Sequence, residues 1–346
     1  MAGSSEFQLG TGEAILSTHP PQELRALGAA VLKQAGATPE VADCVAAALV
    51  AAELDGIASH GLSRLPFYAD QVKSGKVDGK AVPEVACPAS ALVRVDAKSG
   101  FAFPAIEAGL EAADNVVGAT GIVAVAIGNS HHCGVAGHHV ERLAAKQLVG
   151  ILFANTPAAI APWGGKRPLY GTNPIAFACP RRGQSPLVID LSMSVVARGK
   201  VMTAAQKGEA IPPDWALDKE GRPTTDPKAG LAGSMAPLGG AKGAALALMV
   251  ELLAAALTGA HFGFEASSFF DAEGPPPHVG QLFLVIDPSF AGNFGERVEV
   301  LCAAILGDGG ARLPGDRRLA TRARLSRDGI SVPDALMAEL RRRAGA

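Results

Sequence analysis

The sequence predicts an α/β protein in which a central sheet domain is joined to a helical lobe built from both ends of the chain. Between about residues 80 and 300, short apolar runs alternate with helical patterns, as they do where helices cover a sheet. On both sides of that region, apolar residues recur every three or four positions, which is the helical spacing. We therefore assign 1–79 together with 300–346 to the helical lobe and 80–299 to the α/β domain.

The N-terminal segment is predicted to form three helices. From residue 21 to about residue 55 the helical spacing is broken once, at "GATPE", where Thr38 can cap a helix that begins on proline. A third helix is expected to begin near Ser63, because Pro66 is tolerated in a first turn but not in a helix interior. Residues 59–61 then lie in the joint between the second and third helices.

The central region is predicted to alternate strands with helices. The expected strands are "ALVRVD", "GIVAVAIG", "VGILFAN", "PIAFAC", "PLVIDLS" and "GQLFLVID", and the expected helices cover 101–117, 136–147 and 243–258. The Pro/Gly-rich stretch 207–237 is expected to be a long surface loop. The last forty residues return to a helical pattern.

Composition excludes several classes of protein. Of 346 residues, 48% are hydrophobic and 18% are charged, which excludes a disordered chain. The formal net charge of −2 argues against nucleic-acid binding. From residue 311 onward there are nine arginines against four acids, and a solvated helical face is the simplest interpretation of them.

The chain is expected to be a cytoplasmic protein that does not bind a membrane. Its most apolar window, 243–260, is interrupted by Glu251. The first 17 residues lack the basic start and the continuous apolar run of a secretory signal. Five cysteines without a CxxC pair fit a reduced compartment.

No standard nucleotide-binding fingerprint follows any expected strand. The stretch "LGGAKGAALALMVELL" instead places Gly240, Lys242 and Gly243 at the start of the most apolar helix. A helix N-terminus offers unpaired N–H groups and partial positive charge to an anion. A tight turn packed against the sheet explains the same residues, and both interpretations stay open.

Two histidine pairs occur in "GNSHHCGVAGHHVER", but they do not predict a metal site. In a helix, residues seven positions apart are separated by roughly 10 Å along the axis, too far to share one zinc ion. A pocket wall formed by His131 and His132 is the better interpretation.

Polar residues also stand next to two expected strands. Thr172 lies in the turn "YGTNP", for which an ordinary turn is the favoured explanation. Asp190, Leu191 and Ser192 end the strand "PLVIDLS", and open α/β sheets bind ligands at such ends. Asp190 is equally well explained as a helix cap.

The stretch "ASHGLSRLP" concentrates chemistry in the joint before the third helix. His60 can give or take a proton near neutral pH, and Arg64 can bind a carboxylate with two hydrogen bonds. Ser59 can hydrogen-bond the imidazole or the reacting atom. A nucleophilic serine is disfavoured because no G-x-S-x-G elbow occurs. A capped loop with a surface arginine remains the structural alternative.

Taken together and in order, these stretches resemble the malate/L-lactate dehydrogenase family that lacks the Rossmann fold. The resemblance rests on "SHGLSRLPFYADQVKSGKV", "GNSHHCGVAGHHVERLA", "ANTPAAIAPWGGKRPLYGTNPIAFACP", "LVIDLSMSVVARGKV", "GGAKGAALALMVELL" and "RLPGDRR", and it covers about residues 20 to 345. It implies a homodimer with a nicotinamide-binding mixed sheet of its own. It also explains why no Rossmann fingerprint is present.

The resemblance implies a role for each candidate residue. His60 would donate a proton to the carbonyl oxygen or imine nitrogen, with Ser59 as its partner. Arg64 would bind the substrate carboxylate, and Thr172 would contact the substrate. The cofactor would lie along His132, Cys133, Gly134, Val135, Ala136, Asp190, Leu191, Ser192, Gly240, Lys242, Gly243, Arg312, Arg317 and Arg318. Because arginines can bind the 2′-phosphate, NADP is expected rather than NAD.

One position departs from part of the family. In the cyclic-imine reductases an acidic residue follows the glycine of the "ARG" stretch and acts with the serine and histidine, whereas this chain has Lys200 there. A lysine at this position resembles the hydroxy-acid members of the family, and it could neutralise the negative charge of a substrate or a phosphate.

The expected function is therefore NAD(P)-dependent hydride transfer to or from C2 of a small 2-oxo or 2-hydroxy acid of the malate, lactate or sulfolactate type. NADPH-dependent reduction of cyclic 2-imino acids is the alternative.

Overall fold

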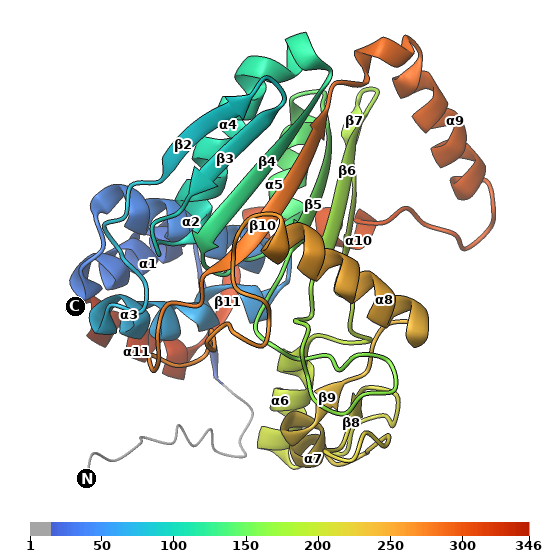
Figure 1. Cartoon of the computed structure of the whole chain (residues 1–346). Coiled ribbons are helices and arrows are strands. Elements are labelled where there is room, and N and C mark those ends of the chain that lie inside the picture. The colour runs from blue at the N-terminus through green and yellow to red at the C-terminus, as the bar shows by residue number, and fades with distance from the viewer. Residues whose placement is uncertain (1–14, 346) are drawn as a thin grey trace.

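A computed structural model of the chain describes residues 15–345, and its centre is a seven-stranded mixed sheet (Figure 1). The strand order is β2-β3-β4-β10-β5-β6-β7. Strands β3 and β4 are parallel, and the other neighbouring pairs are antiparallel. The mixed α/β fold predicted from the sequence is confirmed.

The expected strands and helices form close to their predicted places. The sheet consists of β2 (Glu84–Ala89), β3 (Leu92–Asp96), β4 (Ile122–Ser130), β5 (Val149–Ala154), β6 (Ile175–Arg181), β7 (Gln184–Leu191) and β10 (Val279–Ile286). The helices of the same region are α4 (Ala102–Thr120), α5 (Ala136–Ala145), α6 (Arg198–Lys207), α7 (Pro227–Ala232), α8 (Ala241–Val250) and α9 (Phe294–Leu306).

Helices lie on both faces of the sheet. Successive residues of a strand point to opposite faces, so apolar strands need a covering layer on each side. On one face, a Cβ added to Gly109 of α4 would lie 2.8 Å from Val125 of β4. On the other face, a Cβ added to Gly128 of β4 would lie 2.9 Å from the carbonyl oxygen of Thr258. Thr258 follows the π-helical turn Glu251–Ala256 that continues α8. Small residues on β4 and α4 therefore allow close packing on both faces.

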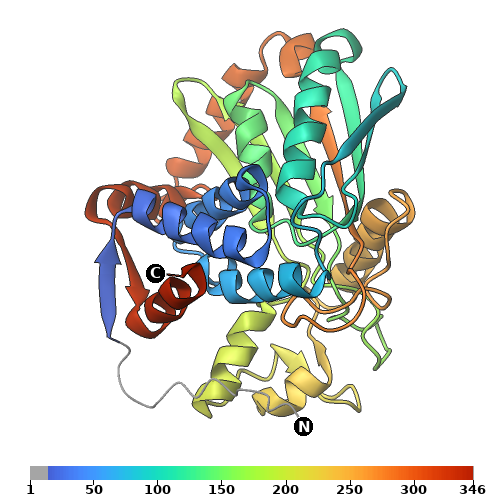
Figure 2. The same ribbon diagram turned by 90° about the vertical axis from the view of Figure 1, so that its left-hand side faces the viewer.

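The two ends of the chain pack together beside the sheet (Figure 2). Strand β1 (Leu16–His19) pairs with β11 (Ile330–Pro333), and these ends share one apolar core. The helices here are α1 (Pro21–Ala35), α2 (Pro39–Leu54), α3 (Leu65–Ser74), α10 (Asp316–Asp328) and α11 (Asp334–Ala344). The boundaries proposed at 79/80 and 299/300 stay a prediction.

Local sequence signals succeed at α2 and fail just after it. Thr38 caps α2 as expected, since its Oγ1 accepts a hydrogen bond from the N–H of Val41 at 3.3 Å. The third helix, however, begins at Leu65, after two 3₁₀ turns, Ala58–His60 and Leu62–Arg64. Arg64 therefore precedes α3 instead of lying in its first turn.

The stretch 207–237 is more ordered than a surface loop. It contains α7 and a two-stranded sheet of β8 (Ala216–Leu217) and β9 (Ser234–Met235). Their apolar side chains join those of α6 and α8 in a small third core. Helix α6 itself was not predicted. Among the described residues, no helix has the length and apolarity that crossing a membrane requires.

Candidate active site

A cavity of about 640 Å³ opens between the 3₁₀ turns after α2, the N-terminus of α5 and the start of α6. Most of the residues singled out from the sequence line it. These are Ser59, His60, Arg64, His132, Cys133, Gly134, Val135, Ala136, Thr172, Asp190 and Ser192. Segments far apart in the chain thus meet at one cavity of the size that small ligands occupy.

The joint that carries Ser59 and His60 is held by a buried carboxylate. The side chain of Glu53 accepts a hydrogen bond from the N–H of Leu62 at 2.7 Å. A Cβ added to Gly61 would lie 2.1 Å from Oε1 of Glu53, so this close approach requires glycine. The resulting turn brings Ser59 Oγ within 3.0 Å of His60 Nδ1, and the two are hydrogen-bonded.

Arg64 is the side chain best placed to bind an anion. It is 8% exposed, its Nε donates to the carbonyl of Ser59 at 2.7 Å, and its guanidinium lies 4.4 Å from the ring centroid of Phe270. Its buried Nη1 has no hydrogen-bond partner among the described residues. A buried guanidinium with a missing partner is unfavourable until a ligand such as a carboxylate supplies one.

The environment of His60 favours the neutral form of its imidazole. Burial, followed by the positive charges of Arg64 and His138, lowers the pKa of His60 to about 4. Its ring centroid lies 5.3 Å from that of His132, whose Nδ1 is hydrogen-bonded to the hydroxyl of Tyr68 at 2.7 Å. A neutral imidazole can accept a proton from a hydroxyl group.

The wall that carries Thr172 is held by another buried carboxylate. Glu251 accepts hydrogen bonds from the N–H groups of Gly171 and Gly263 and from the side chain of Asn173, at 2.8–3.1 Å. The hydroxyls of Thr172 and Thr156 lie 3.3 Å apart. Because Glu251 joins three segments, it fixes the position of Thr172 in the cavity wall.

The N-terminus of α5 supplies groups that suit a dinucleotide. Its N-cap residue, Val135, has no side-chain cap, and the first turn faces the cavity. A helix N-terminus of this kind favours phosphate. Asp190, near the end of β7, accepts a hydrogen bond from the N–H of Gly137 at 2.7 Å and so caps α5, and Ser192 adds a hydroxyl to the same wall. These groups fit a nicotinamide cofactor.

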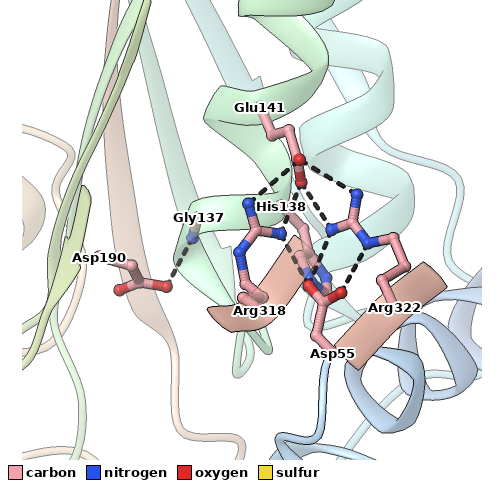
Figure 3. Close-up of polar contacts among 7 residues, drawn as sticks. All are labelled: Asp55, Gly137, His138, Glu141, Asp190, Arg318 and Arg322. Atoms are coloured by element: carbon pink, nitrogen blue, oxygen red, sulfur yellow. Dashed lines mark hydrogen bonds and ion pairs between the residues drawn. The ribbon is translucent and has the colours of Figure 1, made fainter. Parts of the chain in front are cut away.

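An ion-pair cluster connects α5 to the end of α2 and to α10 (Figure 3). Asp55, whose side chain is fully buried, accepts hydrogen bonds from Arg318 and Arg322 of α10 and lies 2.6 Å from Nε2 of His138. Both arginines also bind Glu141 of α5, at 2.8 Å. The guanidinium of Arg318 is therefore engaged with two carboxylates, which leaves less of it for the cofactor contact expected from the sequence.

Several other predicted residues do not line the cavity of the single chain. They are His131, which is 1% exposed, and Lys200, Leu191, Gly240, Lys242, Gly243, Arg312, Arg317 and Arg318. Lys200 is exposed, with its Nζ 5.8 Å from the ring centroid of Trp215. A Cβ added to Gly243 would lie 1.9 Å from the carbonyl oxygen of Leu238, so close packing already explains this glycine. The roles expected for these residues stay predictions.

Sequence reasoning missed other residues of the cavity wall. Arg198, Gly199, Thr156, Phe269 and Phe270 all line it. Of these, Arg198 carried a signal, since it is a charged residue shortly after Asp190 and Ser192 in a stretch already singled out. The two phenylalanines come from an irregular segment before β10, which gives no periodic signal.

Comparison with known proteins agrees with this geometry. A family model described as malate/L-lactate dehydrogenase matches residues 19–341. The NADP(+)-dependent (2R)-3-sulfolactate dehydrogenase of Chromohalobacter salexigens is 58% identical over 323 residues, covering 92% of this chain and 96% of that protein. The Delta(1)-pyrroline-2-carboxylate/Delta(1)-piperideine-2-carboxylate reductase of Pseudomonas syringae pv. tomato is 43% identical over 313 residues, covering 90% of this chain and 91% of that protein.

Solved structures give the same result. The delta1-piperideine-2-carboxylate reductase of Pseudomonas syringae matches with a TM-score of 0.90 and 42% identity, covering 94% of this chain and 99% of that one. The sulfolactate dehydrogenase of Methanocaldococcus jannaschii matches with a TM-score of 0.87 and 31% identity, covering 95% and 97%. The family and the dehydrogenase or reductase activity expected from the motifs are confirmed. The chain belongs to the malate/L-lactate dehydrogenase family and is an oxidoreductase.

Proposed function

We propose that this protein transfers hydride between NADP and C2 of an open-chain 2-oxo or 2-hydroxy acid, with 3-sulfolactate and 3-sulfopyruvate as its substrate pair. The observation that carries the proposal is the cavity in which the unpartnered Nη1 of Arg64 and the imidazole of His60 adjoin the same turn. The 58% identity to a sulfolactate dehydrogenase supports this pair.

Each residue that we propose to act on the substrate has a distinct task. Arg64 binds the C1 carboxylate and so fixes the orientation of C2. His60 exchanges a proton with the oxygen on C2, as a base during oxidation and as an acid during reduction. Ser59, hydrogen-bonded to Nδ1, holds the imidazole in place. Thr172 contacts the substrate from the opposite segment of the wall, and Lys200 adds positive charge near the start of α6.

Bound NADPH would supply the hydride. Residues 134–136, just before Gly137, would bind a phosphate of this cofactor, and Asp190 with Ser192 would bind its hydroxyl groups. Arg312 and Arg317, which are exposed on either side of Gly315, would bind the 2′-phosphate. This arrangement and the NADP(+)-dependent relative support NADP in preference to NAD.

A second reaction, reduction of a cyclic 2-imino acid, is favoured by the 43% identity to a pyrroline- and piperideine-carboxylate reductase. Both reactions are tested by following NADPH absorbance with purified protein and a panel of acids. We expect turnover with 3-sulfopyruvate and little with Δ1-piperideine-2-carboxylate. Turnover confined to the cyclic imine would replace the proposal by the alternative, and turnover of neither class would refute both.

We also propose a cytoplasmic homodimer. Its support is an apolar surface on α8 and the following π-helical turn, where Leu246, Met249 and Leu252 are 41%, 37% and 53% exposed. Large exposed apolar side chains gathered on one helix are typical of an interface. The five cysteines are all free, which fits a reducing compartment.

A further inference from the structure

A second guanidinium stands at the same cavity. Arg198 is the first residue of α6 and lines the cavity together with Ala197 and Gly199. A Cβ added to Gly199 would lie 3.9 Å from Cβ of Ser59, and Arg64 donates to the carbonyl of Ser59. Both Arg64 and the start of α6 therefore lie next to the turn that carries Ser59.

Arg198 has no counter-charge within residues 15–345. Its side chain is half-buried and makes one hydrogen bond, from Nη2 to the carbonyl of Leu231 at 3.3 Å. Neither Arg198 nor Arg64 forms an ion pair with any of the described residues. The next charged residue of α6 is Lys200, which is also positive. Burial lowers the pKa of Arg198 and of Arg64.

Two partly desolvated guanidinium groups at one cavity are unfavourable without anions. A buried charge costs free energy unless an opposite charge and hydrogen bonds compensate it. One carboxylate compensates Arg64 and leaves Arg198 unpaired. The N-terminus of α6 adds to the positive potential, since its N-cap residue, Ala197, has no side-chain cap. A ligand with a second anionic group would therefore compensate Arg198.

We infer that Arg198 binds a second acidic group of the substrate, so that the enzyme selects 2-oxo and 2-hydroxy acids with a sulfonate or carboxylate on C3. The inference rests on the proposed function, which assigns the C1 carboxylate to Arg64. It identifies a specificity residue among open-chain acids, since pyruvate carries one acidic group and has no second one for Arg198 to bind.

Equilibrium binding tests the second anion site without turnover. We would titrate malonate, sulfoacetate and acetate into the NADP⁺-loaded protein by calorimetry. A charge-assisted hydrogen bond corresponds to at least about tenfold in affinity, so the better dianion should bind at least about tenfold more tightly than acetate. Arg198→Gln should remove that difference and leave acetate binding within about twofold. Whichever of malonate and sulfoacetate binds more tightly identifies the preferred acid.

Kinetics supply the second readout. Arg198→Gln should lower kcat/KM at least about tenfold for 3-sulfopyruvate and change it within about threefold for pyruvate. Arg198→Lys, which keeps the charge without the forked donors, should retain part of the preference. Lys207→Gln is the matched control, because it removes one positive charge from the exposed end of α6.

Equal losses with pyruvate and 3-sulfopyruvate would overturn the inference, because they indicate a structural role. A weaker affinity for NADPH in Arg198→Gln would also overturn it, since Arg198 would then bind the cofactor. Failure of the reaction is distinguishable: without turnover of any acid, Arg198-dependent malonate or sulfoacetate binding would keep the anion site and refute only the chemistry. Turnover of 2-oxo acids without such binding would refute only the anion site.

Discussion

The surroundings of His60 and Arg64 change the pKa values of both side chains. The same desolvation that lowers the pKa of His60 also lowers the pKa of Arg64, and Nη1 of Arg64 has no hydrogen-bond partner among the described residues. A substrate carboxylate would compensate Arg64 and thereby remove one cause of the low pKa of His60. Binding of the anion is thus coupled to the ease with which His60 takes up the proton.

Replacing His60 by alanine should lower kcat by at least about 10², because general acid–base catalysis contributes that much. Affinity for NADPH should stay within about threefold, since His60 exchanges a proton with the substrate. Steady-state kinetics and NADPH fluorescence titration measure the two quantities. Unchanged turnover would show that another group exchanges the proton.

The low pKa of His60 gives opposite pH dependences for the two directions. Oxidation of a hydroxy acid needs neutral His60, so kcat/KM should be flat between about pH 5 and 8 and fall as the pH drops through about 4. Reduction needs protonated His60, so its kcat/KM should fall about tenfold for each pH unit above about 4. An oxidation profile that already falls below about pH 6.5, the ordinary value for histidine, would contradict this environment.

The elements around the cavity differ in how well the sequence predicts them. Helix α2 follows from local signals, because apolar spacing and the Thr38 cap lie within a few residues of each other. The two 3₁₀ turns depend on the approach of Glu53 to Leu62 and on the absence of a side chain at Gly61, which no periodic pattern records. The pairing of Asp55 with Arg322 spans 267 positions, so it became visible only when α10 packed against α2.

The ion-pair cluster connects α10 to the end of α2 through Asp55 and to α5 through Glu141. Burial opposes the charge of Asp55, but hydrogen bonds from Arg322, His138 and Arg318 outweigh it and lower the pKa of Asp55. The stabilisation is therefore present above the ordinary pKa of about 3.9 and is lost as the pH falls through the lowered folded value.

Asp55→Ala should lower the free energy of unfolding at neutral pH by about 3 kcal/mol, because two half-buried arginines lose the buried carboxylate that pairs with them. Urea denaturation measures it. The control is Asp43→Ala, which breaks the exposed pair with Arg25 and should cost less than about 1 kcal/mol. Equal losses in the two variants would mean that the cluster contributes no more than a surface pair.

In the whole molecule, the apolar outer face of α8 is connected to the cavity wall through Glu251, the residue that follows this helix. The π-helical turn that continues α8 exposes Leu252 outward and directs the buried Glu251 toward Gly171 and Asn173. A partner covering that surface would therefore stabilise the segment that carries Thr172.

We expect light scattering at micromolar concentration to give twice the 35.1 kDa mass of the chain. Leu252→Glu places a charge on the apolar surface and should shift the protein toward monomer, with a raised KM for the acid. Lys228→Glu, at an exposed position of α7, serves as the comparison. A wild-type protein that runs as a monomer would refute the dimer.

The most direct test of the proposed chemistry follows the hydrogen itself. NADPH carrying deuterium at one or the other C4 position of the nicotinamide would be incubated with 3-sulfopyruvate and the purified protein, and the product examined by NMR and mass spectrometry. We predict 3-sulfolactate with one deuterium on C2 from one of the two labelled forms. Product without deuterium on C2 from either form, or no product, would contradict hydride transfer at this cavity.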